Sequence, residues 1–410
     1  MGFSDKLCLS LQTLRNPQSP AIICSPGLSL MEGGLYNRPV MIDFLSKLVQ
    51  AETTTQTGEL AAAKVISDEF ALSGVKAQID TWGQARANIW ARVGSQGRKP
   101  ALLFACHLDV VGPGDAPWKH PPFSGLQSDG RVYGRGATDM KGGIAAAVAA
   151  IRQIVDSGTS LAGDIVFAAT AGEETDSSGA DRFLAGRCEL PEFAGVVIPE
   201  PTDFEIVTAH RGMLWIEIST KGKAAHGSTP HLGINAIGSA RLLLNSLEKY
   251  QPRAEPHKLL GGCSMSINTI AGGKALNVVP DKCTIGIDFR TLPGQNHADI
   301  LRDLRETFSK LKSADPRFEA EISIVRRVEP METDPDSAFV RDFCAAVGTG
   351  ETKAVGFTTD GPHFARLGTP VVIFGPGKPD ICHKPDEYIE IADVERAVKY
   401  YRDIILKFLA

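Results

Sequence analysis

The sequence predicts an α/β protein that carries an inserted α+β domain. Three observations support this prediction. Short apolar runs alternate with helical patterns in the first half of the chain, and the same style returns near the C-terminus. Between them the order changes to β-α-β-β-α-β, which is the order of a ferredoxin-like sandwich. At 410 residues the chain also exceeds what one hydrophobic core usually supports. We expect a first domain over residues 36–211 and 325–410, and an inserted domain over residues 212–324.

The N-terminal stretch differs from the rest of the chain. Residues 1–35 mix polar, Pro and Gly residues without clear periodicity, which indicates a loosely held extension. An upstream start, with Met31 or Met41 as the natural one, is an equal alternative. Apolar spacing then predicts a helix that begins at Pro39, with its apolar face running to Val49, and a second helix over 59–72; strands over 75–81 and 87–93 follow.

Ionisable side chains follow several apolar runs of this first domain. His107 and Asp109 come directly after the run 101–106, and their spacing of two lets both side chains project to the same side. The run 164–170 is followed by Glu173 and Glu174, and the run 195–198 is followed by Pro199 and Glu200. Because the carboxyl ends of strands meet at one edge of an open α/β sheet, we expect these groups to lie together.

Asp139 adds a further carboxylate to this set. It precedes a helix that begins near Gly142, in which apolar residues recur at helical spacing within an Ala-rich segment. We expect Asp139 at a strand tip, beside the other acidic groups. A late loop, CHKPDEY, then offers His383.

The inserted domain is defined by alternating strands and two helices. Strands are predicted over 213–220, 263–270, 282–290 and 319–325, and helices over 234–248 and 298–311. After it, the chain returns to a helix over 337–347, a strand over 370–374 and a final amphipathic helix. We find no internal repeat and no low-complexity tract.

Composition excludes several classes of protein. The formal net charge of −5 gives no broad cationic surface for nucleic acid or an anionic membrane. The eight cysteines are scattered without CxxC pairs, which suits a reducing cytoplasm. No apolar run approaches the ~20 residues of a membrane span, and the N-terminus lacks the apolar core of a signal peptide. We therefore expect a cytoplasmic protein that binds neither nucleic acid nor membrane.

The collected side chains suit a pair of metal ions. Carboxylates and neutral imidazoles are zinc ligands, and two ions ~3.5–4 Å apart need bridging and terminal groups of this mixed kind. One carboxylate must remain free to act as a base. The candidates are His107, Asp139, Glu173, Glu174, Glu200 and His383.

Each candidate taken alone has a simpler interpretation. Adjacent acids such as Glu173 and Glu174 favour the first turn of a helix, and Asp139 is also a good N-cap. Arg290, at the end of the predicted strand 282–290, is a further charged candidate, and taken alone it could be a surface residue in a salt bridge. The segment from Gly134 to Asp139 imitates a dinucleotide fingerprint, but Asp139 replaces the third glycine. No GxSxG elbow is present, which argues against a serine hydrolase.

Over residues 40–410 the chain resembles the co-catalytic zinc aminoacylase and carboxypeptidase superfamily. Within it, the acetylornithine deacetylase and succinyl-diaminopimelate desuccinylase branch is the most similar. The motifs that carry the resemblance are HLDVV, GRGATDMKGG, GEE, PEPT, KAAHGSTPH, NVVPD, DFR and CHKPDEY. The resemblance implies a zinc-peptidase-like catalytic domain with a central mixed sheet. It also implies that the ferredoxin-like insert is a dimerisation or lid domain.

The resemblance further implies a role for each matched residue. Asp139 bridges two divalent ions, most simply zinc, with cobalt or manganese as alternatives; His107 and Glu200 complete one side, and Glu174 and His383 the other. Asp109 orients His107, and Glu173 is the general base. His226 reaches the active site of the other subunit of a homodimer and stabilises the oxyanion. Substrate-binding roles fall to Asn277, Arg290 and Thr359.

The function implied is hydrolysis of an acetyl or succinyl group from the nitrogen of an amino acid with a free carboxylate. A carboxypeptidase or dipeptidase of the same superfamily is the alternative within the enzymes. A non-catalytic binding descendant is the alternative outside them, and loss of metal ligands would be its mark. None of the matched ligand positions is lost in this sequence.

Overall fold

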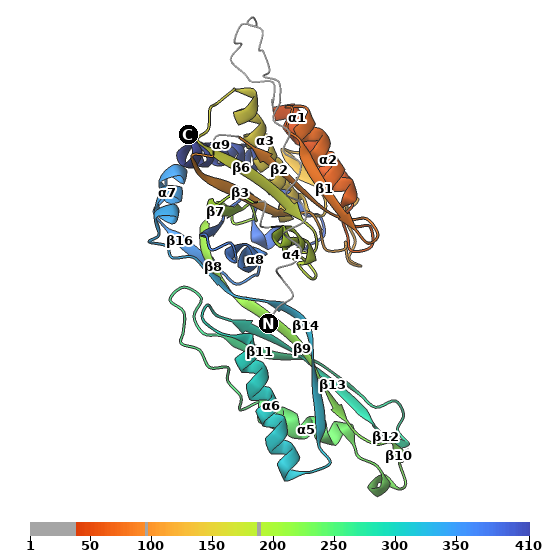
Figure 1. Cartoon of the computed structure of the whole chain (residues 1–410). Helices are drawn as coiled ribbons and strands as arrows, with labels where there is room; N and C mark the ends of the chain where they lie inside the picture. The colour runs from red at the N-terminus through yellow and green to blue at the C-terminus, as the bar shows by residue number, and fades with distance from the viewer. Residues whose placement is uncertain (1–37, 95–96, 187–189) are drawn as a thin grey trace, which may run out of the picture. The chain divides into compact units, whose positions relative to one another are not determined.

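The computed structural model describes residues 38–94, 97–186 and 190–410, so the expected extension over 1–35 lies outside the described residues. Its largest sheet is mixed, with the strand order β1-β2-β6-β3-β7-β17-β8-β15, and β16 pairs with β8 (Figure 1). The central strands β6, β3, β7 and β17 run parallel. The strands are β1 (Ala77–Trp82), β2 (Arg86–Val93), β3 (Lys99–His107), β6 (Gly163–Thr170), β7 (Phe193–Ile198), β8 (Ile206–His210), β15 (Met331–Glu332), β16 (Thr352–Val355) and β17 (Val371–Ile373).

Helices cover both faces of this sheet, as an α/β fold requires. One face packs against α1 (Arg38–Gln50), α2 (Leu60–Ala71), α3 (Gly142–Asp156), α7 (Ala338–Val347) and α9 (Ile391–Leu409). The opposite face packs against the short helices α4 (Ser178–Ala185) and α8 (Gly361–Ala365). The central strand β6 is buried along its whole length, which explains its unbroken apolar sequence. The predicted fold class is therefore confirmed.

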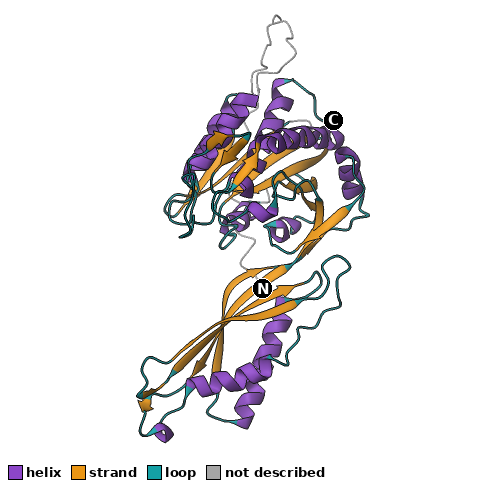
Figure 2. Ribbon diagram, turned by 180° about the vertical axis from the view of Figure 1, so that it is seen from behind, coloured by secondary structure: helices purple, strands orange, loops and turns teal. Residues whose placement is uncertain are grey.

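A second sheet of four antiparallel strands has the order β11-β13-β9-β14. Its two helices lie on one face of the sheet (Figure 2), where they bury a separate apolar core. The chain order is β-α-β-β-α-β, as the alternation of the sequence predicts. The elements are β9 (Gly212–Lys221), α5 (Ala236–Leu247), β11 (Ser264–Gly272), β13 (Lys282–Thr291), α6 (His297–Ala314) and β14 (Glu319–Val328). A two-stranded sheet, β10 (Ala225–His226) with β12 (Val278–Val279), lies within the same stretch of chain.

The surroundings of Asp139 correct one expectation. Asp139 does not end a strand of the large sheet. It lies in an irregular helical segment, Ala137–Lys141, which leads directly into α3. The strand before it, β5 (Arg131–Tyr133), belongs to a separate three-stranded sheet with β4 (Leu126–Ser128) and β18 (Tyr388–Glu390). Gly134 and Gly136 both have positive φ, so the chain turns away from β5 before it reaches Asp139.

Two short 3-10 segments, Pro230–Leu232 and Pro379–Ile381, complete the regular elements of the described chain. Across the described ranges, no helix combines the length and apolar character needed to cross a membrane.

Candidate metal centre

Three neighbouring strands of the large sheet deliver the first group of ionisable side chains. His107 is the last residue of β3, which lies between β6 and β7. Glu173 and Glu174 follow β6, and Glu200 follows β7. Because these three strands are parallel, their carboxyl ends meet at one edge. The expectation from strand order thus accounts for four of the candidate side chains.

Asp139 reaches the same place from the irregular segment that precedes α3 rather than from a strand. The first turn of α3 packs tightly on the end of β7, because a Cβ atom at Gly143 would lie 2.0 Å from the carbonyl oxygen of Pro199. Only glycine permits this approach. The backbone N–H groups of Thr138 and Asp139 donate to the buried carboxylate of Glu387, at 3.0 and 3.2 Å.

Two sets of possible metal ligands share Asp139. Its Oδ1 lies 3.1 Å from His107 Nε2, and His107 Nε2 lies 3.4 Å from Glu200 Oε1. Its Oδ2 lies 3.3 Å from His383 Nε2, which is 2.8 Å from Glu174 Oε1. Within each set, the ligand atoms all lie within 4.8 Å of one another. A carboxylate that offers one oxygen to each set has the geometry of a bridging ligand.

The backbone of Asp109 fixes the tautomer of His107. The Nδ1–H of His107 donates to the carbonyl oxygen of Asp109 at 3.0 Å, which leaves Nε2 to face Asp139 and Glu200. The carboxylate of Asp109 lies farther away, at 3.7 Å. It instead accepts the N–H groups of Gly172 and Glu173 on Oδ1 and that of Glu174 on Oδ2, at 2.8, 3.0 and 3.0 Å. The side chain of Asp109 therefore supports the loop after β6, and its carbonyl orients His107.

The pKa values of this cluster are shifted because it holds more carboxylates than cationic groups. Burial raises the pKa of Glu200 to about 7. Burial alone lowers the pKa of His107, but attraction by Glu200 and Asp139 outweighs it and the net shift is upward. Hydrogen bonds with Asp139 and Glu174 raise the pKa of His383 to about 10. Clustered carboxylates stay ionised only beside cations, and metal ions compete with protons for these ligands. The donor set therefore fits two divalent cations.

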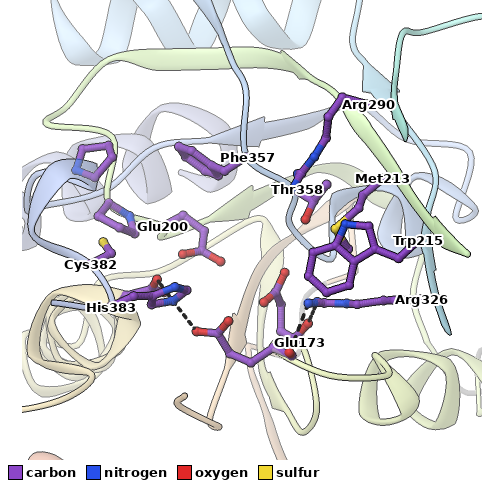
Figure 3. Close-up of a pocket in the computed structure, with 14 residues that line it drawn as sticks. Glu173, Glu200, Met213, Trp215, Arg290, Arg326, Phe357, Thr358, Cys382 and His383 are labelled. Carbon is purple, nitrogen blue, oxygen red and sulfur yellow. Dashed lines mark hydrogen bonds and ion pairs between the residues drawn. The ribbon is translucent and has the colours of Figure 1, made fainter. Parts of the chain in front are cut away.

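Glu173 belongs to neither set of ligands. It is buried, yet its side chain lines the pocket together with those of Glu174 and Glu200 (Figure 3). Burial raises the pKa of Glu173 well above its usual value, and repulsion by Glu174 and Asp360 adds to the effect. A carboxyl group of raised pKa beside candidate metal ligands suits proton transfer near neutral pH.

Residues of the four-stranded sheet line one side of the pocket. Its volume is about 360 Å³, within the range of small-molecule sites. Arg290 lies at the end of β13, where its Nε is 3.0 Å from the carboxylate of Asp288. Residues of β9 and β14 and of the loops around the centre complete the lining: Met213, Trp215, Arg326, Pro201, Phe357, Thr358, Pro379 and Cys382.

Three residues predicted from the sequence are not brought to this pocket within one chain. His226 and Asn277 lie beside each other at β10 and β12, where the N–H of Gly227 donates to the carbonyl oxygen of Asn277. Neither lines the pocket. Thr359 is buried and its hydroxyl accepts the N–H of Gly361 at the start of α8, so its neighbour Thr358 faces the pocket instead.

Sequence reasoning missed three supporting residues. Glu387 holds the backbone before α3 and pairs with the buried Arg135, Nη1 to Oε2, at 2.5 Å. It stands in the same CHKPDEY segment as His383, so proximity in sequence was a usable signal. Arg326 lines the pocket from β14, and no motif pointed to it.

The fold and the site define a class of protein: an α/β protein with an inserted α+β domain and an acidic, imidazole-containing centre that suits a pair of divalent cations. The family model described as peptidase family M20/M25/M40 matches residues 103–407. The chain belongs to this family, and it is an enzyme of the amidohydrolase kind.

Relatives agree with this assignment. A probable succinyl-diaminopimelate desuccinylase of Staphylococcus epidermidis is 30% identical over 404 residues, covering 90% of this chain and 97% of the relative. An acetylornithine deacetylase of Myxococcus xanthus is 30% identical over 368 residues, covering 87% and 94%. Among solved structures, the Bacillus subtilis YXEP protein, described as a dinuclear metal binding peptidase of the M20 family, superposes with a TM-score of 0.68 at 17% identity. That match covers 90% of this chain and 97% of that one.

Proposed function

We propose that this enzyme removes an acetyl or succinyl group from the nitrogen of an amino acid that carries a free carboxylate. The observation that carries the proposal is the composite site: two candidate ligand sets share Asp139, and Glu173 and Arg290 line the same pocket. The names of the two relatives support an N-acyl amino acid as substrate.

The proposed metal ligands form two sets, according to the distances between their ligand atoms. His107, Asp139 and Glu200 hold one ion, and Asp139, Glu174 and His383 hold the other. Mixed imidazole and carboxylate ligands favour zinc, with cobalt or manganese as alternatives. Two such ions supply Lewis-acid activation of a water molecule and of the amide carbonyl. The description of the Bacillus subtilis structure as dinuclear supports a pair of ions.

Glu173 is the proposed general base. Its carboxylate takes a proton from the attacking water and later delivers that proton to the leaving nitrogen. Burial raises the pKa of Glu173, so its ionised form is a stronger base toward the attacking water, and the proton it gains passes to the leaving nitrogen as the carbon–nitrogen bond breaks. The Asp109 carboxylate holds the N–H groups of the loop that carries Glu173, and so fixes where this proton is exchanged.

Recognition of the substrate carboxylate is assigned to Arg290, whose planar guanidinium can pair with two carboxylate oxygens. A homodimer is proposed to complete the site. His226 ends β10 and Asn277 directly precedes the paired strand β12, so they would reach the pocket of the partner subunit as one unit.

The test combines metal analysis with a panel of substrates. Purified protein is measured for zinc, cobalt and manganese, and assayed on N-acetyl amino acids, N-succinyl amino acids and dipeptides. We expect two ions per chain and turnover of the acylated amino acids. The Glu173→Gln variant should keep both ions and lose turnover by about 10²–10⁴-fold.

The matched control is Glu205→Gln, an exposed glutamate outside the pocket, which should behave as wild type. Undiminished turnover by Glu173→Gln would show that Glu173 is not the general base. Faster cleavage of dipeptides than of acylated amino acids would show that the enzyme is a peptidase and not a deacylase.

A further inference from the structure

Arg326 connects the four-stranded sheet to the loop that follows β6. Its Nη1 donates to the carbonyl oxygen of Glu174 at 3.1 Å, and its Nη2 donates to the carbonyl oxygen of Glu173 (Figure 3). The guanidinium also lies 6.0 Å from the ring centre of Trp215. One cationic group thus holds the backbone of two adjacent residues, one the proposed base and the other a proposed ligand.

A shift in strand register places Arg326 on this side of the sheet. In the pairing of β14 with β9, Ile322 lies opposite Ile218 and Ile324 opposite Ile216, but Arg326 lies opposite Trp215. One residue of β14 is therefore left over between Ile324 and Arg326. Because side chains alternate along a strand, this extra residue turns Arg326 from the face covered by helices to the face that Trp215 occupies.

The other side of the same loop is held by a charge of opposite sign. The Asp109 carboxylate accepts the N–H groups of Gly172, Glu173 and Glu174, while Arg326 donates to the carbonyl oxygens of Glu173 and Glu174. Asp109 follows β3 of the large sheet, and Arg326 lies on β14 of the four-stranded sheet. The loop is therefore fixed from both sheets, through hydrogen bonds to ionised groups, which are stronger than neutral ones.

We propose that Arg326 is a positioning residue: from the four-stranded sheet it sets the loop that carries Glu173 and Glu174. This inference rests on the proposed function for its effect on turnover. Its structural part, the clamp on the loop, does not. Loss of the guanidinium removes one of the two restraints on the loop and lets the carboxylate of Glu173 shift, and a displacement of about 1 Å in a catalytic group can lower turnover by about 10²-fold.

The test compares Arg326→Met with Arg327→Met. Arg327 is the next residue on β14, but it is exposed and pairs with Glu329. Both variants remove one arginine from the same strand, so general effects on β14 cancel. We measure amide hydrogen exchange of residues 171–177 by mass spectrometry, the metal content, and kcat and KM on the best substrate of the panel.

For Arg326→Met we expect exchange of the amides at 172–174 to rise by about tenfold. We also expect kcat to fall by about 10²-fold while KM changes little. Arg327→Met should leave all of these values unchanged. Arg326→Lys should recover part of kcat, because a lysine keeps the charge but cannot span two carbonyl groups with a planar fork.

The outcomes separate this inference from the proposed function. Unchanged exchange in Arg326→Met would overturn the clamp. A rise in KM with unchanged kcat, the pattern expected for Arg290→Met, would show that Arg326 binds substrate instead. If wild type cleaves nothing in the panel, the proposed function fails, and the exchange comparison still decides whether the clamp exists. Should Arg326→Met not fold, Arg326→Lys supplies the same comparison.

Discussion

Asp109 offers the sharpest quantitative prediction, because its carboxylate makes three hydrogen bonds that a single substitution changes in a known way. Asp109→Asn keeps the size of the side chain and removes its charge. One oxygen of the carboxylate becomes an NH2 group. The carboxylate accepts two N–H groups on Oδ1 and one on Oδ2, so at least one backbone N–H must then face a donor.

The magnitude follows from these contacts. A buried N–H without a partner costs about 1–3 kcal/mol, and hydrogen bonds to a neutral acceptor contribute about 1 kcal/mol less each than bonds to a charged one. Removal of the buried charge of Asp109 offsets part of this loss, since a neutral amide is easier to desolvate. We expect Asp109→Asn to lower the free energy of unfolding by about 2–4 kcal/mol.

The assay is urea unfolding of metal-free protein, followed by tryptophan fluorescence, with Asp115→Asn as the control. Asp115 is exposed, and its substitution should leave the midpoint unchanged. A midpoint for Asp109→Asn equal to that of the control would refute the account of the loop. So would a loss of stability with no faster amide exchange at residues 172–174, because the destabilised groups would then lie elsewhere.

Two further predictions concern the dimer and the response to acid. His226→Ala and Glu173→Ala subunits, each inactive alone, should regain about half of wild-type turnover in mixed dimers, because one of the two composite sites is then intact. Mixed dimers verified by mass that stay inactive would exclude catalysis in trans. Burial lowers the pKa of His210 to about 4 in the folded protein. The unfolded chain therefore binds an extra proton between about pH 6.5 and 4, and stability falls as pH falls through this window. The loss at His210 amounts to about 3 kcal/mol at pH 4, and His210→Gln should show a shallower pH dependence in urea unfolding of metal-free protein. Equal slopes for the two proteins would contradict this assignment.

The sequence by itself determined the fold class and most of the centre. Buried strands read as unbroken apolar runs, and parallel strands bring their carboxyl ends to one edge, so His107, Glu173, Glu174 and Glu200 could be grouped without coordinates. The alternating pattern and the helical spacing likewise gave the order of the inserted elements. These features follow from local periodicity, which a single sequence records directly.

Only the tertiary structure decided how the groups are supported. Asp139 reaches the centre from the segment just before α3. The first turn of α3 packs on the end of β7 through Gly143 and Pro199, and such close packing leaves no pattern in composition. The carbonyl of Asp109 orients His107, while its carboxylate holds the loop after β6. Both groups belong to one residue, so the sequence could not separate the two roles. Arg326 faces the pocket because a single residue of β14 lacks a partner in β9. Since the side chains of a strand alternate with a period of two, one such shift reverses their direction, and it depends on pairing between segments that lie far apart in the sequence.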